Sequence, residues 1–293
     1  MSKLTYKSLK SKINNLKQYY DHFSIGKSLL GEEIEVFHIG SYTGKQVVVE
    51  AGIHAREYIS TLAVIEEISH TRKNFFHFNY GIYFIPLVNP DGVRLSLDGY
   101  NFIQDKNLRE YLFFLNNNST DFSLWKANIR GVDLNSNFNA LWGKGRYNKF
   151  SPAPEGFVGP YPNSEPENQN LIALLKTISI AGSLSIHTKG EVVYYGYDNL
   201  SREELKRDEF IATTLANYLG FIPEKTIESV GGFSDFISET YHVPAFTIEL
   251  GNDNLPHPLN KKCLENILPS FLGVTNHFIS ILDKQSNKCS INY

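Results

Sequence analysis

The apolar positions of the chain predict strands that alternate with helices. β-branched and aromatic runs predict buried strands over residues 33–39, 46–53, 81–88, 183–187 and 245–250. Helical patterns cover residues 58–70, 165–179, 201–219 and 260–282. The strand patterns are continuously apolar, which is typical of strands buried on both faces. The chain is therefore predicted to have an α/β fold, a mixed, mostly parallel twisted sheet flanked by helices on both faces.

The chain organisation predicts a single catalytic domain. The 293 residues are 42% hydrophobic, and they contain no internal repeat or low-complexity linker. Residues 89–92, Asn-Pro-Asp-Gly, are expected to form a turn that ends the strand before them. We expect a domain over residues 24–283, preceded by a helical, polar extension (1–23) and followed by a tail (284–293).

Charge and composition exclude several classes of function. A net charge of −3 gives no general attraction to nucleic acid or to an anionic membrane. No stretch approaches the roughly 18 apolar residues of a membrane span. The first residues are basic and polar and do not resemble a signal peptide, so a cytoplasmic location is expected, with an extracellular one left open. The two cysteines are too few for a disulfide framework.

Three ionisable side chains stand at the ends of predicted strands. His54 follows the strand over 46–53, His187 ends the strand over 183–187, and Glu249 lies near the end of the strand over 245–250. In α/β sheets, ligand sites gather at the carboxyl ends of the strands. The three residues are therefore expected to share one site.

His54 and Glu57 have the spacing of a metal-binding pair. Residues three apart on a loop that enters a helix point to the same side, and imidazole nitrogen and carboxylate oxygen are both zinc ligands. A catalytic zinc takes a third protein ligand, for which His187 is the candidate. The sequence thus predicts one Zn²⁺ per chain. The plainer alternatives are a surface pair for His54 and Glu57 and a hydrogen-bonded core histidine for His187.

Glu249 is the candidate general base. Within the apolar segment AFTIELG its carboxylate would be partly desolvated, which raises the pKa of a carboxylic acid toward the working range of a base. The alternative is a partner in a buried salt bridge.

Seven sequence blocks occur in an order that resembles a known family. They are HARE, IPLVNPDG, KANIRGVDLNSNF, SEPE, SIHTKGE, GGFSDF and FTIELG. From about Ser24 to about Pro258 the chain resembles the zinc carboxypeptidase superfamily (the M14 metallopeptidases). KANIRGVDLN, SEPE and HTKGEVVYY resemble the bacterial branch that cleaves the γ-D-glutamyl–diaminopimelate bond of peptidoglycan peptides. The resemblance implies a zinc peptidase in which His54, Glu57 and His187 bind the metal and Glu249 is the base.

The resemblance also implies a cation for the oxyanion. The family places an arginine at the start of the string R-x-N-x-x-G-x-D-x-N, where this chain has Lys126, and Arg130 is the other candidate. Lysine supplies the charge without the bidentate fork of arginine. We expect Lys126 to take this role, and the alternative is that one of the two cations pairs with Asp133.

The substrate-binding positions depart from the family pattern. Asn135 is kept, but Ser136 replaces the arginine that holds a terminal carboxylate, Ile227 replaces a mobile tyrosine, and Ser234 is the pocket floor. Serine cannot form a bidentate ion pair with a carboxylate. These departures favour a γ-linked peptidoglycan stem peptide as substrate. A conventional metallocarboxypeptidase, a deacylase of small amino-acid conjugates and an inactive binding protein of this fold are the alternatives.

Overall fold

An eight-stranded sheet organises the chain in the computed structural model, which describes residues 4–197, 199–227 and 230–289. The strand order is β1-β2-β4-β3-β5-β8-β6-β7. The strands are β1 (Asp21–Lys27), β2 (Glu33–Gly40), β3 (Lys45–Ala51), β4 (Tyr80–Ile85), β5 (Ile180–Thr188), β6 (Val192–Tyr195), β7 (Ile222–Lys225) and β8 (Ala245–Leu250).

The centre of the sheet is parallel and its flanks are antiparallel in part. β4, β3, β5 and β8 run parallel to one another, whereas β1 with β2, β2 with β4, and β6 with β8 are antiparallel. β4 lies between β2 and β3, although β2 and β3 are adjacent in sequence. This arrangement confirms the predicted mixed α/β fold and brings the carboxyl ends of β3, β5 and β8 to the same edge.

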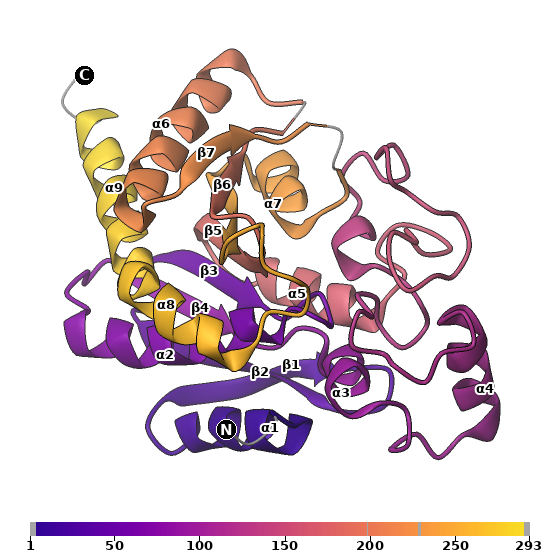
Figure 1. The fold of residues 1–293 in the computed structure, drawn as a ribbon. Coiled ribbons are helices and arrows are strands. Elements are labelled where there is room, and N and C mark those ends of the chain that lie inside the picture. The colour runs from indigo at the N-terminus through magenta and orange to yellow at the C-terminus, as the bar shows by residue number, and fades with distance from the viewer. Residues whose placement is uncertain (1–3, 198, 228–229, 290–293) are drawn as a thin grey trace.

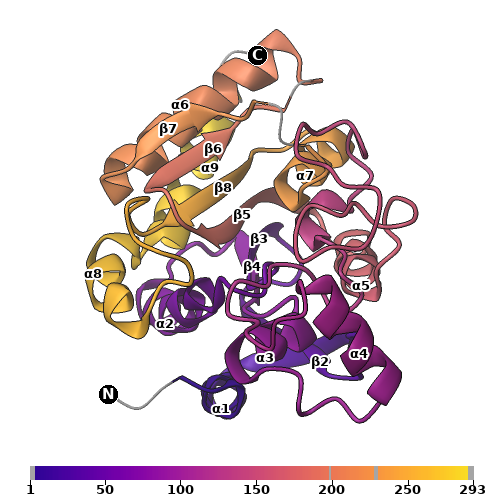
Figure 2. The same cartoon turned by 45° about the vertical axis from the view of Figure 1, so that its right-hand side comes forward.

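Helices cover both faces of the sheet (Figures 1 and 2). α1, α2, α6, α8 and α9 pack on one face, and α5 and α7 pack on the other. The helices are α1 (Tyr6–Leu16), α2 (Tyr58–Asn74), α3 (Pro90–Asp98), α4 (Lys106–Leu115), α5 (Pro166–Leu175), α6 (Arg202–Leu219), α7 (Phe233–Tyr241), α8 (Lys261–Phe271) and α9 (Val274–Cys289).

Successive residues of β3 contribute to different cores. Val47 and Val49 pack with α2 and α9, whereas Val48 packs with α5 and α7, and all three valines are fully buried. Side chains of a strand alternate between the two faces of a sheet, so a central strand must be apolar throughout. This two-sided burial explains the continuous apolar runs of the sequence.

Two predicted elements differ from the structure. Residues 89–92 begin α3 instead of forming a turn: Asn89 is the N-cap, its side chain accepts a hydrogen bond from Gly92 N, and Pro90 opens the helix. The single helix predicted over residues 260–282 is two helices, α8 and α9. Gly273 lies between them with φ +91°, a left-handed conformation that breaks the helix.

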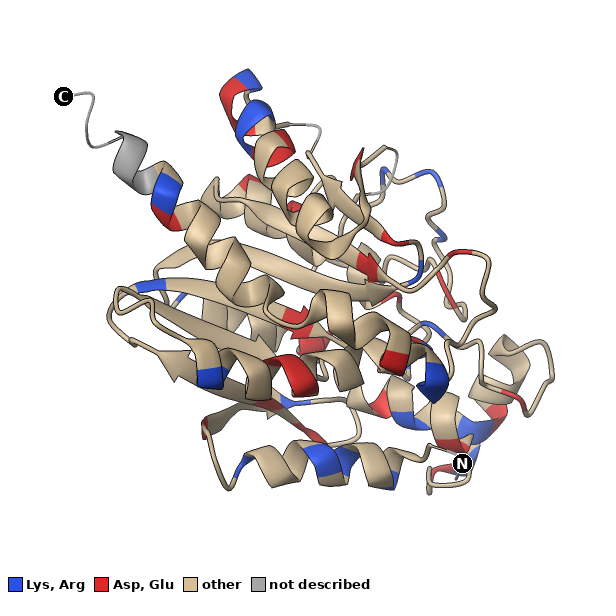
Figure 3. Cartoon of the chain, turned by 60° about the vertical axis from the view of Figure 1, so that its left-hand side comes forward, with Lys and Arg blue, Asp and Glu red and all other residues tan. Residues whose placement is uncertain are grey.

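The N-terminal helix packs against the rest of the chain. Leu9 is fully buried in the larger core, and Lys10 and Lys17 pair with Glu32 and Glu35 at 3.1 and 2.5 Å. Figure 3 shows that α1 carries basic residues while α6 carries both signs of charge. These pairs offset the charge of α1.

The predicted domain boundaries at residues 24 and 283 stay a prediction. Residues 1–3 of the predicted extension and 290–293 of the predicted tail lie outside the described residues. Among the helices that the structure describes, none has the length and apolar character needed to cross a membrane.

Candidate active site

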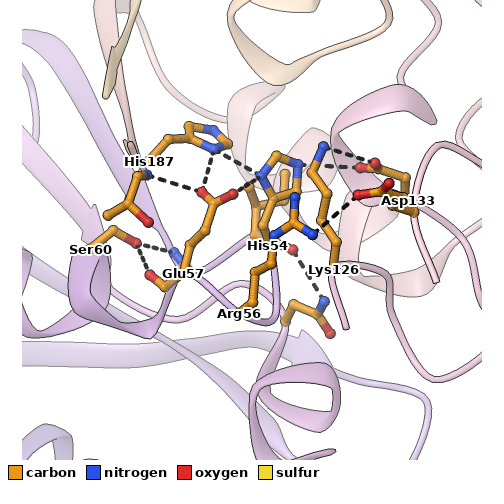
Figure 4. Close-up of polar contacts among 12 residues, drawn as sticks. His54, Arg56, Glu57, Ser60, Lys126, Asp133 and His187 are labelled. Carbon is orange, nitrogen blue, oxygen red and sulfur yellow. Dashed lines mark hydrogen bonds and ion pairs between the residues drawn. The ribbon is translucent and has the colours of Figure 1, made fainter. Parts of the chain in front are cut away.

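The connection between β3 and α2 carries His54 and Glu57. Gly52 turns the chain with φ +65°, and a side chain at this position would come within 2.5 Å of Thr61 Oγ1. Ser60 closes the turn, because its Oγ accepts a hydrogen bond from Gly52 N at 3.2 Å and donates one to Glu57 O at 2.7 Å. Figure 4 shows His54 and Glu57 directed toward the same point.

His187 reaches this point from the neighbouring strand. Its Nδ1 lies 3.0 Å from Nδ1 of His54 and 3.1 Å from Oε2 of Glu57, and His54 Nδ1 lies 2.9 Å from Glu57 Oε1. The three side chains are buried (Figure 4). Within the described part of the chain, they form the group of His, Cys, Asp and Glu residues whose donor atoms are close enough to hold a metal ion.

A carboxylate and a hydroxyl lie beside the outer ring nitrogens of the two imidazoles. His54 Nε2 lies 3.2 Å from Oδ1 of Asp133, an acceptor, and His187 Nε2 lies 2.9 Å from Ser185 Oγ. Ser185 gives its hydroxyl proton to Glu50, so its oxygen accepts from His187. With the proton of each ring on Nε2, beside these oxygens, the Nδ1 lone pairs point inward.

The inward-facing donors fit a zinc ion. Two imidazole lone pairs and a carboxylate converge within 3.1 Å of one another, an arrangement that is repulsive unless a cation lies between them. Burial lowers the pKa of His54, but the carboxylates of Glu57 and Asp133 outweigh this effect and raise it, so the surroundings favour a positive charge. Two histidines and one glutamate are also a ligand set of catalytic zinc sites.

Glu249 stands beside this group on β8. The register of the parallel strands pairs Glu249 with His187 on β5. Its Oε2 is buried and has no hydrogen-bond partner among the described residues. Burial raises the pKa of Glu249 to about 8, which suits a group that must accept a proton near neutral pH.

Lys126 lies on the opposite side of His54. Its Nζ is 3.1 Å from Oδ2 of the buried Asp133, and its backbone oxygen accepts a hydrogen bond from Ala55 N at 2.9 Å. Burial lowers the pKa of Lys126, but Asp133 and Glu57 raise it by more, so the lysine keeps its charge. The pair predicted as an alternative does form, but Lys126 also faces the active-site cavity.

A cavity of about 360 Å³ opens onto these groups. The predicted site residues that line it are His54, Lys126, Asn135, Ser136, His187, Ile227, Ser234 and Glu249. Arg130 lies elsewhere: its guanidinium is 58% exposed and 3.7 Å from Glu165. The structure therefore brings Lys126 to the site and leaves Arg130 outside it.

The predicted substrate-binding side chains differ in the hydrogen bonds that they already make within the chain. Asn135 Oδ1 accepts a hydrogen bond from Phe233 N at 2.9 Å, so its amide nitrogen is the group that can donate to a ligand. Ser234 Oγ lies 3.1 Å from Thr247 Oγ1. Ile227 is 73% exposed at the rim of the cavity.

The sequence reasoning gave no role in the site to several residues that the structure places in or beside it. Asp133 and Ser185 lie beside the histidines, and Asn89 bonds the carbonyls of Ile53 and Ala127, thereby fixing the segments that carry His54 and Lys126. Asp133 stands in the GVDLN string beside the predicted Asn135, which was the available signal for it. Nothing in the sequence singled out Glu224 or Asp235, which also line the cavity.

Comparisons with known proteins agree with this geometry. The sequence pattern of the zinc carboxypeptidase family matches residues 6–268. The chain is 29% identical over 286 residues to γ-D-glutamyl-L-diamino acid endopeptidase 1 of Lysinibacillus sphaericus, covering 92% of this chain and 70% of that protein. It is 33% identical over 256 residues to the uncharacterized protein YqgT of Bacillus subtilis, covering 81% of this chain and 66% of the relative.

Solved structures share the fold. Bovine thrombin-activatable fibrinolysis inhibitor matches with a TM-score of 0.76 at 18% identity, over 97% of this chain and 98% of that one. Murein-tripeptide amidase MpaA from Escherichia coli O157 matches with a TM-score of 0.54 at 22% identity, over 88% and 91% of the two chains.

Proposed function

The chain belongs to the zinc carboxypeptidase family, and from this premise we propose that it hydrolyses an amide bond in peptidoglycan-type peptides. The bond proposed is the one that joins a γ-D-glutamyl residue to a diamino acid such as diaminopimelate. His54, Glu57 and His187 would hold one zinc ion. The observation that carries the proposal is the lining of the active-site cavity, where Ser136 stands in place of a carboxylate-binding arginine and Glu224 supplies a negative charge.

The catalytic groups have complementary tasks. A zinc ion, when bound, polarises the scissile carbonyl and lowers the pKa of water. Glu249 accepts the proton of the attacking water at its buried carboxylate and returns it to the departing nitrogen. Lys126 Nζ lies on the side of His54 away from Glu57 and donates to the oxyanion of the tetrahedral intermediate. Asp133 holds that ammonium in place.

The charged side chains that line the cavity bear on the choice of leaving group. Ser136 stands where an arginine would bind a terminal carboxylate, and Lys126 is the one lysine or arginine among the described residues that line the cavity. Glu224 and Asp235 line it as well, and Glu224 has no ion-pair partner among the residues described. The carboxylate of Glu224 attracts an ammonium group of the leaving residue. A diamino acid supplies such a group.

The name of the Lysinibacillus relative supports this substrate class, since it is a γ-D-glutamyl-L-diamino acid endopeptidase. A conventional metallocarboxypeptidase, a deacylase and an inactive binding protein are the competing functions. The first requires a carboxylate anchor that Ser136 does not provide. The cytoplasmic location stays an expectation.

A paired substrate assay tests the proposal. The zinc-loaded protein is incubated with L-Ala-γ-D-Glu-diaminopimelate and with the all-L, α-linked analogue, and products are identified by mass. We expect cleavage of the γ-linked peptide at a kcat/KM at least tenfold higher, with E249Q keeping its zinc but losing turnover. Cleavage of the α-linked peptide alone would support a conventional carboxypeptidase instead.

A further inference from the structure

A second cavity begins where the active-site cavity ends. It has a volume of about 380 Å³, and it shares Lys126 and Ser136 with the first cavity. Its far wall is formed by Gly145, Tyr147, Asn148, Lys149 and Val230. Ser136 therefore stands at the junction of the two spaces.

The wall at this junction is fixed by its backbone. A Cβ added to Gly231, which has φ +87°, would lie 3.0 Å from the backbone oxygen of Ser136, so the two segments are in close contact. Phe138 N donates a hydrogen bond to Gly231 O at 3.0 Å. Because these contacts hold the backbone in place, the side chain at position 136 is the part of this wall whose size a substitution can change.

The far wall is an ordered loop. Lys149 N donates to Gly156 O at 2.7 Å, Val158 N donates to Lys149 O at 3.2 Å, and Asn148 N donates to Gly145 O at 3.2 Å. These bonds fix the position from which the side chains of Asn148 and Lys149 extend.

The second cavity contains a cationic side chain and a hydrogen-bond donor that are available to bind an anion. Its two carboxylates are already paired, Asp133 with Lys126 at 3.1 Å and Glu155 with Arg56 at 3.1 Å. Lys149 has no ion-pair partner within the described part of the chain. The buried Nδ2 of Asn148 is a hydrogen-bond donor without a partner there. Asn148 lines the cavity, so this donor is available to an acceptor there.

We propose that the second cavity binds the C-terminal continuation of the leaving peptide, and that Lys149 and Asn148 bind its terminal carboxylate. This proposal rests on the proposed function, because it assumes that the leaving residue occupies the first cavity. The small side chain of Ser136 lets the peptide pass from one cavity to the next. The chain would then act as an endopeptidase on extended peptides, and the terminal carboxylate would be recognised beyond Ser136.

Peptides that differ only at their C-terminus test the proposal. The tripeptide L-Ala-γ-D-Glu-diaminopimelate is compared with the tetrapeptide extended by D-Ala, as the free acid and as the amide. For K149A we expect kcat/KM to fall about fivefold to tenfold on the tetrapeptide acid and less than twofold on the amide and the tripeptide. K144A is the matched control, since Lys144 is an exposed lysine of the same loop that lines neither cavity. Equal effects of K149A on acid and amide would overturn the assignment.

S136R tests the passage between the cavities. An arginine at the junction should lower kcat/KM on both tetrapeptides at least tenfold relative to the tripeptide, whereas S136A should leave the ratio unchanged. An unchanged ratio in S136R would show that extended peptides do not pass this residue.

Two further measurements separate this proposal from the proposed function. The same three C-termini are assayed in an all-L, α-linked series, so that the effect of K149A is measured in whichever series is cleaved. Peptide dissociation constants are also measured with E249Q and E249Q/K149A, which need no turnover. Cleavage of the α-linked series alone contradicts the proposed function. In that case, if K149A loses the preference for the free acid over the amide, the result still supports binding of the terminal carboxylate in the second cavity.

Discussion

The carboxylate of Asp133 lies 3.1 Å from the ammonium of Lys126, and its other oxygen lies 3.2 Å from His54 Nε2. Gly156 N holds the same carboxylate with a hydrogen bond of 3.0 Å. One buried side chain thus contacts both a candidate metal ligand and the cation proposed for the oxyanion. The two functions of the site are coupled through it.

Replacing Asp133 should therefore weaken both functions. D133N keeps the size of the side chain and removes its charge, and we expect about a 10- to 100-fold loss in zinc affinity or in kcat/KM. Zinc dissociation constants and steady-state kinetics measure the two effects. D98N, outside the active-site cavity, is the control. Wild-type values for both quantities in D133N would exclude a positioning role.

Lys126 and Arg130 can be separated by substitution. K126A should lower kcat about 100- to 1,000-fold, the typical effect of losing one oxyanion donor, whereas R130A should change it less than twofold because its guanidinium faces Glu165. K126R should restore part of the rate. The reverse ranking, with R130A the slower enzyme, would assign the oxyanion to Arg130.

At low pH, the dependence of kcat/KM on pH should reflect the ionisation of Glu249. The base works when deprotonated, so activity is present above its pKa and is lost as the pH falls through it. Burial raises this pKa to about 8 from 4.5, and the charge of a bound zinc ion pulls it back. The limb of kcat/KM is therefore expected between these two values. A limb at or below 4.5 would contradict the burial of the active base.

Glu67 should stabilise the fold without affecting catalysis. Its buried carboxylate accepts hydrogen bonds from Gly273 N at 2.7 Å and Thr275 N at 3.0 Å, at the start of α9. E67A leaves these donors unsatisfied and should lower the free energy of unfolding by about 1–3 kcal/mol in urea titrations. The half-buried neighbour Glu66 gives a matched control in E66A, and equal losses in the two variants would refute the capping role.

Three residues of the candidate site could be predicted because each stands at the end of a predicted strand. His54, His187 and Glu249 each close an apolar run, and the parallel order of β3, β5 and β8 brings those ends together. The choice between Lys126 and Arg130 could not be made in the same way. It depends on the turn at Gly131, where φ is +76° and Asn128 Oδ1 binds the backbone nitrogens of Arg130 and Val132. A side-chain hydrogen bond of this kind produces no repeating pattern of apolar residues in the sequence.

The break between α8 and α9 was missed for a similar reason. The apolar pattern continues through residues 260–282, but Gly273 takes a left-handed conformation and its backbone nitrogen is bonded by Glu67, far away in the chain. A contact with a residue distant in sequence therefore helps to determine where the two helices are divided. The second cavity was equally hidden, since it depends on how the loop over residues 145–149 folds against Val230.

The register that sets His187 beside Glu249 has a consequence for how this scaffold can change. Interstrand hydrogen bonds between β5 and β8 fix the separation of these two groups. The residues proposed to distinguish one peptide from another, such as Ile227 and Lys149, lie instead on the connecting segments. Such segments can be shortened, lengthened or grafted from relatives while the chemistry keeps its spacing, so new specificities are open to this chain at little cost to its catalytic frame.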